Sequence, residues 1–164
     1  MPITHNAMDE LALSIGRATI AWGDLQENLG HLFSSVLFGS LDDVALACWH
    51  SHKNDRAQRE MLISAARSKL APNPDVEREV IWIADRANRL SALRNDMIHS
   101  SYAILTCCDG SKKPIPHGYY GNKCAKNLEN GKEKDIVKRF SDFAIQIEAL
   151  SKRCDGAFQL VLGI

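Results

Sequence analysis

The stretch that decides the fold is DVEREVIWIADRANRLSALRNDMIHS, which covers residues 75–100. Two prolines just before it, in Ala71-Pro72-Asn73-Pro74, end any preceding helix because they fix the backbone and remove N–H donors. Apolar residues then recur at spacings of three and four, the period of one helix face. They are Val76, Val80, Ile83, Ala87, Leu90, Met97 and Ile98. The pattern predicts a long helix that ends near Ser100.

The same period recurs on both sides of this helix. Residues 6–38 are expected to form a first long helix, residues 43–70 a second that breaks near 52–54, and residues from about 133 onward a last one. Residues 102–106 predict a short strand, and the Asp-Gly pair at 109–110 is a hairpin signal. We therefore expect an all-α protein, an up-and-down bundle of four to five helices with an irregular loop or short β-hairpin before the last helix.

Size and composition predict a single domain, residues 1–164, in which residues 101–131 are a basic insertion. A chain of 164 residues is long enough for one domain with a hydrophobic core and short for two such domains. The formal net charge of zero argues against a protein that binds nucleic acid through its overall charge. No apolar run approaches the roughly 20 residues that span a bilayer, and an odd number of cysteines, five, favours reduced thiols. We expect a cytoplasmic protein with no membrane partner.

One residue departs from the apolar stripe of residues 75–100. Arg94 falls at its centre, and a guanidinium cannot lose its charge, so it needs anionic or carbonyl partners. Asn95 and His99 share an adjacent helix face, whereas Asp96 points away from them. A fixed cation beside a titratable imidazole suits phosphoryl transfer on RNA: the imidazole moves a proton near neutral pH, and the cation stabilises charge on the phosphate oxygens.

These residues also have a structural interpretation. An arginine on an apolar stripe is often paired with a carboxylate from a neighbouring helix, and a histidine near a helix C-terminus often only complements the helix dipole. Periodicity and spacing alone do not decide between the two interpretations.

In spacing and position the segment resembles the HEPN superfamily, whose members share an all-helical bundle. Many members carry an Arg, four to six residues and then a His, often with Asn after the Arg. The segment Arg94-Asn95-Asp96-Met97-Ile98-His99 has four intervening residues and the Asn, and it lies late in a long helix. A long first helix with Trp22 and Glu27 adds to the resemblance, which covers residues 8–105 and the last helix. The insertion matches no common pattern of the family.

The resemblance implies a metal-independent endoribonuclease that acts as a homodimer on single-stranded RNA, a toxin or defence effector with an antitoxin or regulatory protein as partner. Such an enzyme needs no cofactor. It implies that His99 is the general base or acid at the 2′-hydroxyl or leaving oxygen, that Arg94 binds the scissile phosphate, and that Asn95 orients the phosphate or the imidazole. The product would be a 2′,3′-cyclic phosphate. Because non-catalytic members exist, the second hypothesis is a module that binds RNA, a nucleotide or a protein without turnover.

The insertion itself predicts contacts with RNA. Residues 110–128 contain four lysines and no acidic residue, with aromatic and histidine side chains between them. They are Lys112, Lys113, His117, Tyr119, Tyr120, Lys123 and Lys126. Lysines contact phosphates and tyrosines stack on unpaired bases, so this segment is predicted to flank the catalytic residues. The alternatives are a solvated loop and a surface that recognises a protein.

The cysteines and the other histidines do not predict a metal site. Cys48, His50 and His52 lie close together, and Cys107, Cys108, His117 and Cys124 lie in the insertion. Neither group has the Cys-x-x-Cys pairing of a structural zinc site. We expect no metal.

Overall fold

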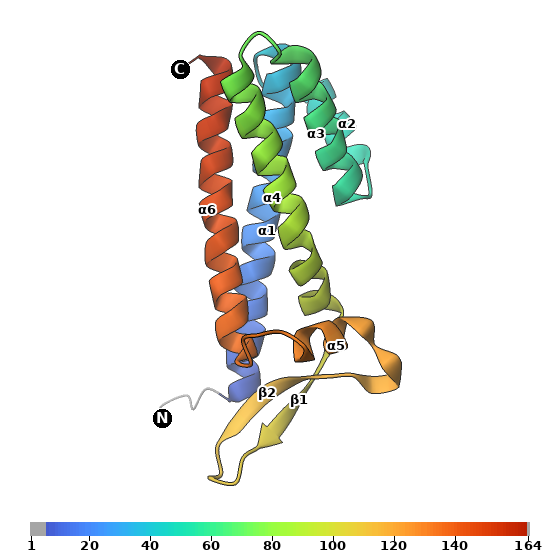
Figure 1. The fold of residues 1–164 in the computed structure, drawn as a ribbon, viewed down its shortest axis with the longest axis vertical. Helices are drawn as coiled ribbons and strands as arrows, with labels where there is room; N and C mark the ends of the chain where they lie inside the picture. Colours follow the sequence, from blue (N-terminus) through green and yellow to red (C-terminus); the bar gives the residue numbers. More distant parts are fainter. Residues whose placement is uncertain (1–5, 164) are drawn as a thin grey trace. The chain divides into compact units, whose positions relative to one another are not determined.

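The computed structural model describes residues 6–163, which are mostly helical (75%) with one small antiparallel sheet (Figure 1). The helices of this part of the chain are α1 (Ala7–Phe38), α2 (Asp43–Ser51), α3 (Asp55–Lys69), α4 (Pro74–His99), α5 (Lys123–Glu129) and α6 (Ile136–Leu162). The strands are β1 (Ser101–Thr106) and β2 (Lys112–His117), and η1 (Tyr119–Gly121) is a 3₁₀ turn. The predominance of helix expected from the sequence is confirmed.

The chain divides into two compact units. The first, which we call the hairpin unit, comprises residues 1–20 and 91–146, and the second, the helical unit, comprises residues 21–90 and 147–164. Helices α1, α4 and α6 each contribute residues to both units. None of the helices among residues 6–163 combines the length and the apolar character that crossing a lipid bilayer requires.

In the helical unit, capping residues divide the second predicted helix into α2 and α3. The Asp42 side chain accepts hydrogen bonds from the backbone N–H groups of Val44 and Ala45, and Asn54 does the same for Arg56. The break near residues 52–54 is therefore confirmed. The core between α1 and α2 is tight, because the rings of Phe33 and Trp49 lie 5.5 Å apart and the Trp49 ring rests on Gly30.

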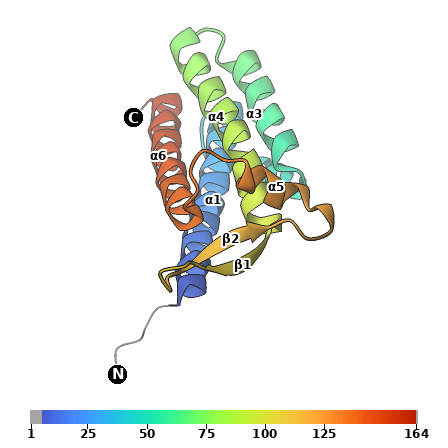
Figure 2. The ribbon, with the colours of Figure 1, turned by 60° about the horizontal axis from the view of Figure 1, so that its bottom comes forward.

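In the hairpin unit, β1 and β2 pair from Ser101 opposite His117 to Thr106 opposite Lys112. Gly110 has a φ of 81°, a conformation that favours glycine, and the N–H of Cys107 donates to the carbonyl of Ser111 at 2.8 Å. Helix α5 packs beside β2 (Figures 1 and 2). Every helix that enters this unit contributes buried hydrophobic residues: Leu11, Ala18, Met97, Ala125, Leu128, Ile136, Phe140, Phe143 and Ala144. Pro114 and Pro116 of β2 are buried as well.

Of the irregular loop or short β-hairpin expected before the last helix, the hairpin is thus present, but a helix within residues 101–131 was not expected. This stretch contains β2, η1 and α5, and α6 begins at Ile136 rather than near residue 133. Helix α5 forms because the side chain of Asn122 accepts hydrogen bonds from the N–H groups of Cys124 and Ala125, which would otherwise lack partners. The prolines and glycines before it hid this capping signal.

We predict that Gly30→Ala destabilises the protein. The added Cβ would lie 2.9 Å from Cδ1 of Trp49, whose indole is fully buried, so the core must shift at a cost of about 1–3 kcal/mol. Gly23 is the matched control, because it lies on the same helix with no atom within 4 Å of its added Cβ. Gly23→Ala is expected to stabilise by roughly 0.5–1 kcal/mol, since alanine is the better helix former. Chemical denaturation of both variants measures the difference, and equal effects would contradict the packing at Gly30.

Candidate functional site at the end of α4

The sequence motif occupies the last turn and a half of α4, within the hairpin unit. Arg94 is half-buried, while Asn95 and His99 are exposed, and His99 is the last residue of the helix. Residues five apart lie about 140° apart around a helix, whereas Asn95 and His99, four apart, lie in one row. The Arg94 Nη1 donates to Oδ1 of Asn95 at 3.1 Å. The amide therefore draws the guanidinium toward the row that contains His99.

The Arg94 guanidinium has donors to spare. Its Nε is buried and has no hydrogen-bond partner among the residues that the structure describes, and none of the ion pairs between them involves Arg94. The carboxylate that the structural interpretation requires is thus not found in this part of the chain. An unpaired buried donor costs about 1–3 kcal/mol, so a half-buried cation with one amide partner favours the approach of an anion.

The main-chain carbonyls at the end of α4 are bonded by side chains of the hairpin unit. The Tyr102 hydroxyl donates to the carbonyl of Met97 at 2.6 Å, and Nδ2 of Asn122 donates to the carbonyl of His99 at 3.0 Å. The Ser100 hydroxyl donates to the carbonyl of Asp96 at 2.5 Å. The last carbonyls of a helix have no partner within it and would otherwise need water. These bonds fix the turn that carries His99 while its imidazole stays exposed.

The sequence reasoning missed these supporting residues. Asn122 has two roles, because the same side chain caps α5 and bonds the end of α4. An Asn just before a run of helix-forming residues is a capping signal that could have identified it. The sequence predicts that Tyr102 lies in a strand, but no local pattern identifies the Met97 carbonyl as the acceptor of its hydroxyl. Long-range partners of this kind cannot be read from spacing.

Asp96 is directed toward α5, in agreement with the expectation that it points away from the row of Asn95 and His99. Its Oδ1 accepts a hydrogen bond from Nδ2 of Asn127 at 3.0 Å. The pKa of the Cys124 thiol is raised, first by burial and then by its hydrogen bond to Asp96. Partners in α5 thus bind the one carboxylate of the motif.

The predicted RNA-binding residues belong to the same unit as the motif, on two different elements. Lys112, Lys113 and His117 lie on β2, and Lys123 and Lys126 lie on α5; all four lysines are exposed.

The two predicted tyrosines lie in η1. Tyr119 is 60% exposed, and its ring packs edge-on against that of His117 with centroids 3.8 Å apart. The side chain of Tyr120 lies outside the described residues. An exposed ring next to lysines keeps the RNA-contact hypothesis open, but no hydrogen bond or ion pair among the described residues joins this group to Arg94 or to the His99 ring.

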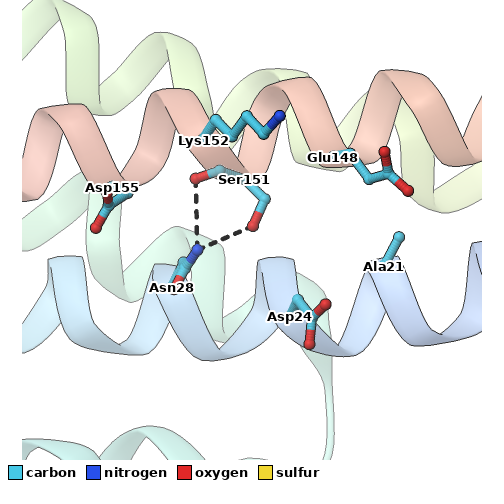
Figure 3. A pocket seen from close by; sticks show the side chains of 7 residues that line it. All are labelled: Ala21, Asp24, Asn28, Glu148, Ser151, Lys152 and Asp155. Atoms are coloured by element: carbon cyan, nitrogen blue, oxygen red, sulfur yellow. Dashed lines mark hydrogen bonds between the residues drawn. The ribbon is translucent and has the colours of Figure 1, made fainter.

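A hollow in the helical unit is an alternative to this site. It has a volume of about 260 Å³ and lies between α1 and α6, where Nδ2 of Asn28 donates to Oγ of Ser151 at 2.9 Å (Figure 3). Its charged lining residues are Asp24, Glu148, Asp155 and Lys152. Three carboxylates against one lysine repel a phosphodiester, so this hollow does not suit RNA.

Two further histidines, His31 and His50, form a small cluster in the helical unit. The carboxylate of Glu27 lies 3.4 Å from Nε2 of His31 and 3.6 Å from Nε2 of His50. Within residues 6–163, no group of three or more His, Cys, Asp and Glu side chains is placed to hold a metal ion. The five cysteines are free thiols.

Comparison of the chain with protein-family models, with curated proteins and with solved structures finds no match.

We predict that Tyr102→Phe lowers stability and changes its pH dependence. Burial raises the pKa of Tyr102 above its ordinary value of 10.0. The unfolded chain ionises first, so this contribution to stability is present below pH 10 and is lost as the pH rises from there toward the raised folded value. Loss of the bond to Met97 costs about 0.5–1.5 kcal/mol at neutral pH.

Urea denaturation at about pH 8 and about pH 10.5 measures this, and the unfolding free energy of the parent should fall more steeply than that of the variant. Tyr119→Phe, at an exposed ring, is the control. The same pH slope in the parent and in Tyr102→Phe would contradict the assignment.

Proposed function

We propose that the chain is a metal-independent endoribonuclease of the HEPN type that cleaves single-stranded RNA by attack of the 2′-hydroxyl. The observation that carries the proposal is Arg94, a half-buried cation with one amide partner and an unpaired Nε, on the helix turn that ends in exposed His99. A guanidinium with unused donors next to an accessible imidazole fits a phosphodiester better than it fits a packing role.

The reaction assigns one task to each side chain. The neutral imidazole of His99 takes the proton of the ribose 2′-hydroxyl, and the 2′-oxygen attacks phosphorus. Arg94 donates hydrogen bonds to the non-bridging oxygens as their charge grows, and Asn95 holds the guanidinium in place. The bond from phosphorus to the 5′-oxygen breaks, and that oxygen takes a proton from a second imidazole. The products are a 2′,3′-cyclic phosphate and a free 5′-hydroxyl.

The second imidazole makes a homodimer part of the proposal, with His99 of the partner subunit as the general acid. The proposal also includes the finer fold of the family, an up-and-down bundle of four to five helices in a single domain. Lysines on β2 and α5 would hold the flanking phosphates, and the exposed ring of Tyr119 would stack on a base. The biological role proposed is that of a cytoplasmic toxin or defence effector controlled by an antitoxin or another regulatory protein.

One observation favours the second candidate, a module of the same family that binds RNA, a nucleotide or a protein without turnover. No described residue forms a hydrogen bond with the His99 imidazole, whereas catalytic imidazoles are usually oriented by a second group. Arg94 could then bind a phosphate that is never cleaved. Binding of RNA without any cleavage, unaffected by His99→Ala, would establish this candidate instead.

We predict that the purified protein cleaves single-stranded RNA in EDTA and that His99→Ala lowers the rate by about 10²–10⁴-fold. Arg94→Lys should also lose activity, because an ammonium cannot replace the planar donor pair. Gel analysis of a labelled RNA with terminal cyclic phosphate detection measures both the rate and the product. Circular dichroism establishes that the variants remain folded.

His52→Ala is the matched control for the histidine, because His52 is exposed and lies in the helical unit between α2 and α3. Arg56→Lys is the control for the arginine, since Arg56 is exposed and pairs with Glu60. Both controls should retain full activity. Undiminished cleavage by His99→Ala, or cleavage that occurs only with added divalent metal, would overturn the proposed function.

A further inference from the structure

The two strands of the hairpin differ in what their outer edges can pair with. Cys107 and Ser111 form a hydrogen-bonded pair, and such pairs recur at every second residue of an antiparallel ladder. On β1 the residues that bond to β2 are therefore Leu105, Ala103 and Ser101. The other residues of β1 direct their N–H and carbonyl groups outward, away from β2: Tyr102, Ile104 and Thr106. On β2 the outward positions are Lys112, Pro114 and Pro116.

The prolines confirm this alternation and close one edge. Proline has no N–H and can stand only where the ladder does not need one, and Pro114 and Pro116 both occupy outward positions. Two of the three donors on the β2 edge are therefore missing, and α5 packs beside this strand (Figure 2). The β2 edge cannot accept a further strand.

The β1 edge has none of this protection. Its sequence, SYAILT, contains no proline and no charged residue, and it is rich in residues that favour strands. Ile104 and Leu105 are 37% and 42% exposed. Within the described chain, no backbone hydrogen bond from outside the hairpin reaches Tyr102, Ile104 or Thr106. Three consecutive outward residues offer six hydrogen bonds to an added strand.

We propose that this edge binds an extended, acidic segment of a partner protein as a third strand. Charge is the argument for its chemistry: exposed Lys112 and Lys113 of β2 lie across the hairpin from Thr106 and Leu105, and the guanidinium of Arg94 lies on the last turns of α4, which leads into the other end of β1. Asp109 is the one acidic residue of the sequence from 101 to 128. A segment with an apolar centre opposite Ile104 and carboxylates at both ends complements this surface.

A second copy of the chain fits the edge less well. Antiparallel pairing of all three outward residues with their copies centres on Ile104, which separates the two Ser101 residues, where α4 leads into β1, by six residues of strand, about 20 Å. Such a pair could not share one active site. The added strand would instead lie next to His99, where it would restrict access to the catalytic residues. The inference goes beyond the proposed nuclease, and its readout is binding, so either can fail alone.

A capped nine-residue peptide, EEVTVTVEE, is the probe. In amide NMR spectra of the full chain it should shift the resonances of Tyr102, Ile104 and Thr106 and slow their hydrogen exchange at least about 10-fold, with smaller effects at Ala103 and Leu105. The peptide KKVTVTVKK should bind at least about 10-fold more weakly. Alternate amides of the bound peptide face β1, and the others face away from it. N-methylation of the set that faces β1 should abolish binding, whereas N-methylation of the other set should leave binding intact.

Ile104→Ala keeps the N–H and should retain binding within a few-fold, whereas Ile104→Pro removes it and should abolish binding. Circular dichroism and the NMR spectrum test whether the proline variant keeps its fold, and the N-methylated peptides test the edge without any change to the protein. The proposal is overturned if the acidic peptide leaves the three amides unchanged up to about 1 mM, or if the basic peptide binds equally well. A homodimer that Ile104→Pro dissolves would also overturn it, because a second copy would then occupy the edge.

Discussion

The carbonyl groups at the C-terminal end of α4 are the constraint on which the candidate site depends. A helix end exposes carbonyls that must find partners, and here Tyr102 and Asn122 provide them for Met97 and His99. Because the acceptors of these bonds are main-chain carbonyls, the bonds occupy none of the side chains of the motif. The turn is held in place while Arg94 keeps unused donors and His99 stays exposed. A rigid backbone with available side chains is what a binding or catalytic site requires.

The same unit separates its charges. The single carboxylate of the motif, on Asp96, is bound by Asn127, and the lysines of β2 and α5 add positive charge without a carboxylate between Gly110 and Leu128. The acidic hollow, in contrast, belongs to the helical unit. The proposed contacts with RNA therefore rest on the lysines of the hairpin unit. The β2 edge of its hairpin is closed by two prolines, whereas the β1 edge has none, and the proposed binding of a protein strand rests on this difference.

Much of this fold follows from local pattern. Periods of three and four residues located α1, α4 and α6, and the prolines near residue 73 marked a helix boundary, because such signals act within a few residues. Helix α5 was missed, since glycines and prolines before Asn122 resemble an irregular loop and the helix is only seven residues long. The sequence proposes the candidate site as a motif, Arg94 and His99, but does not give the structure around it. Its supports, Tyr102, Asn122 and Asn127, are joined to it by tertiary contacts that no spacing encodes.

Binding of a phosphodiester by Arg94 and His99 together is the central claim, and NMR titration with an uncleavable 2′-O-methyl oligonucleotide tests it most directly. The guanidinium N–H resonances of Arg94 and the ring resonances of His99 should shift together and saturate at one oligonucleotide concentration. Arg56 and His52 should not respond. Shifts confined to the lysines of β2 and α5, with Arg94 and His99 unchanged, would contradict the account.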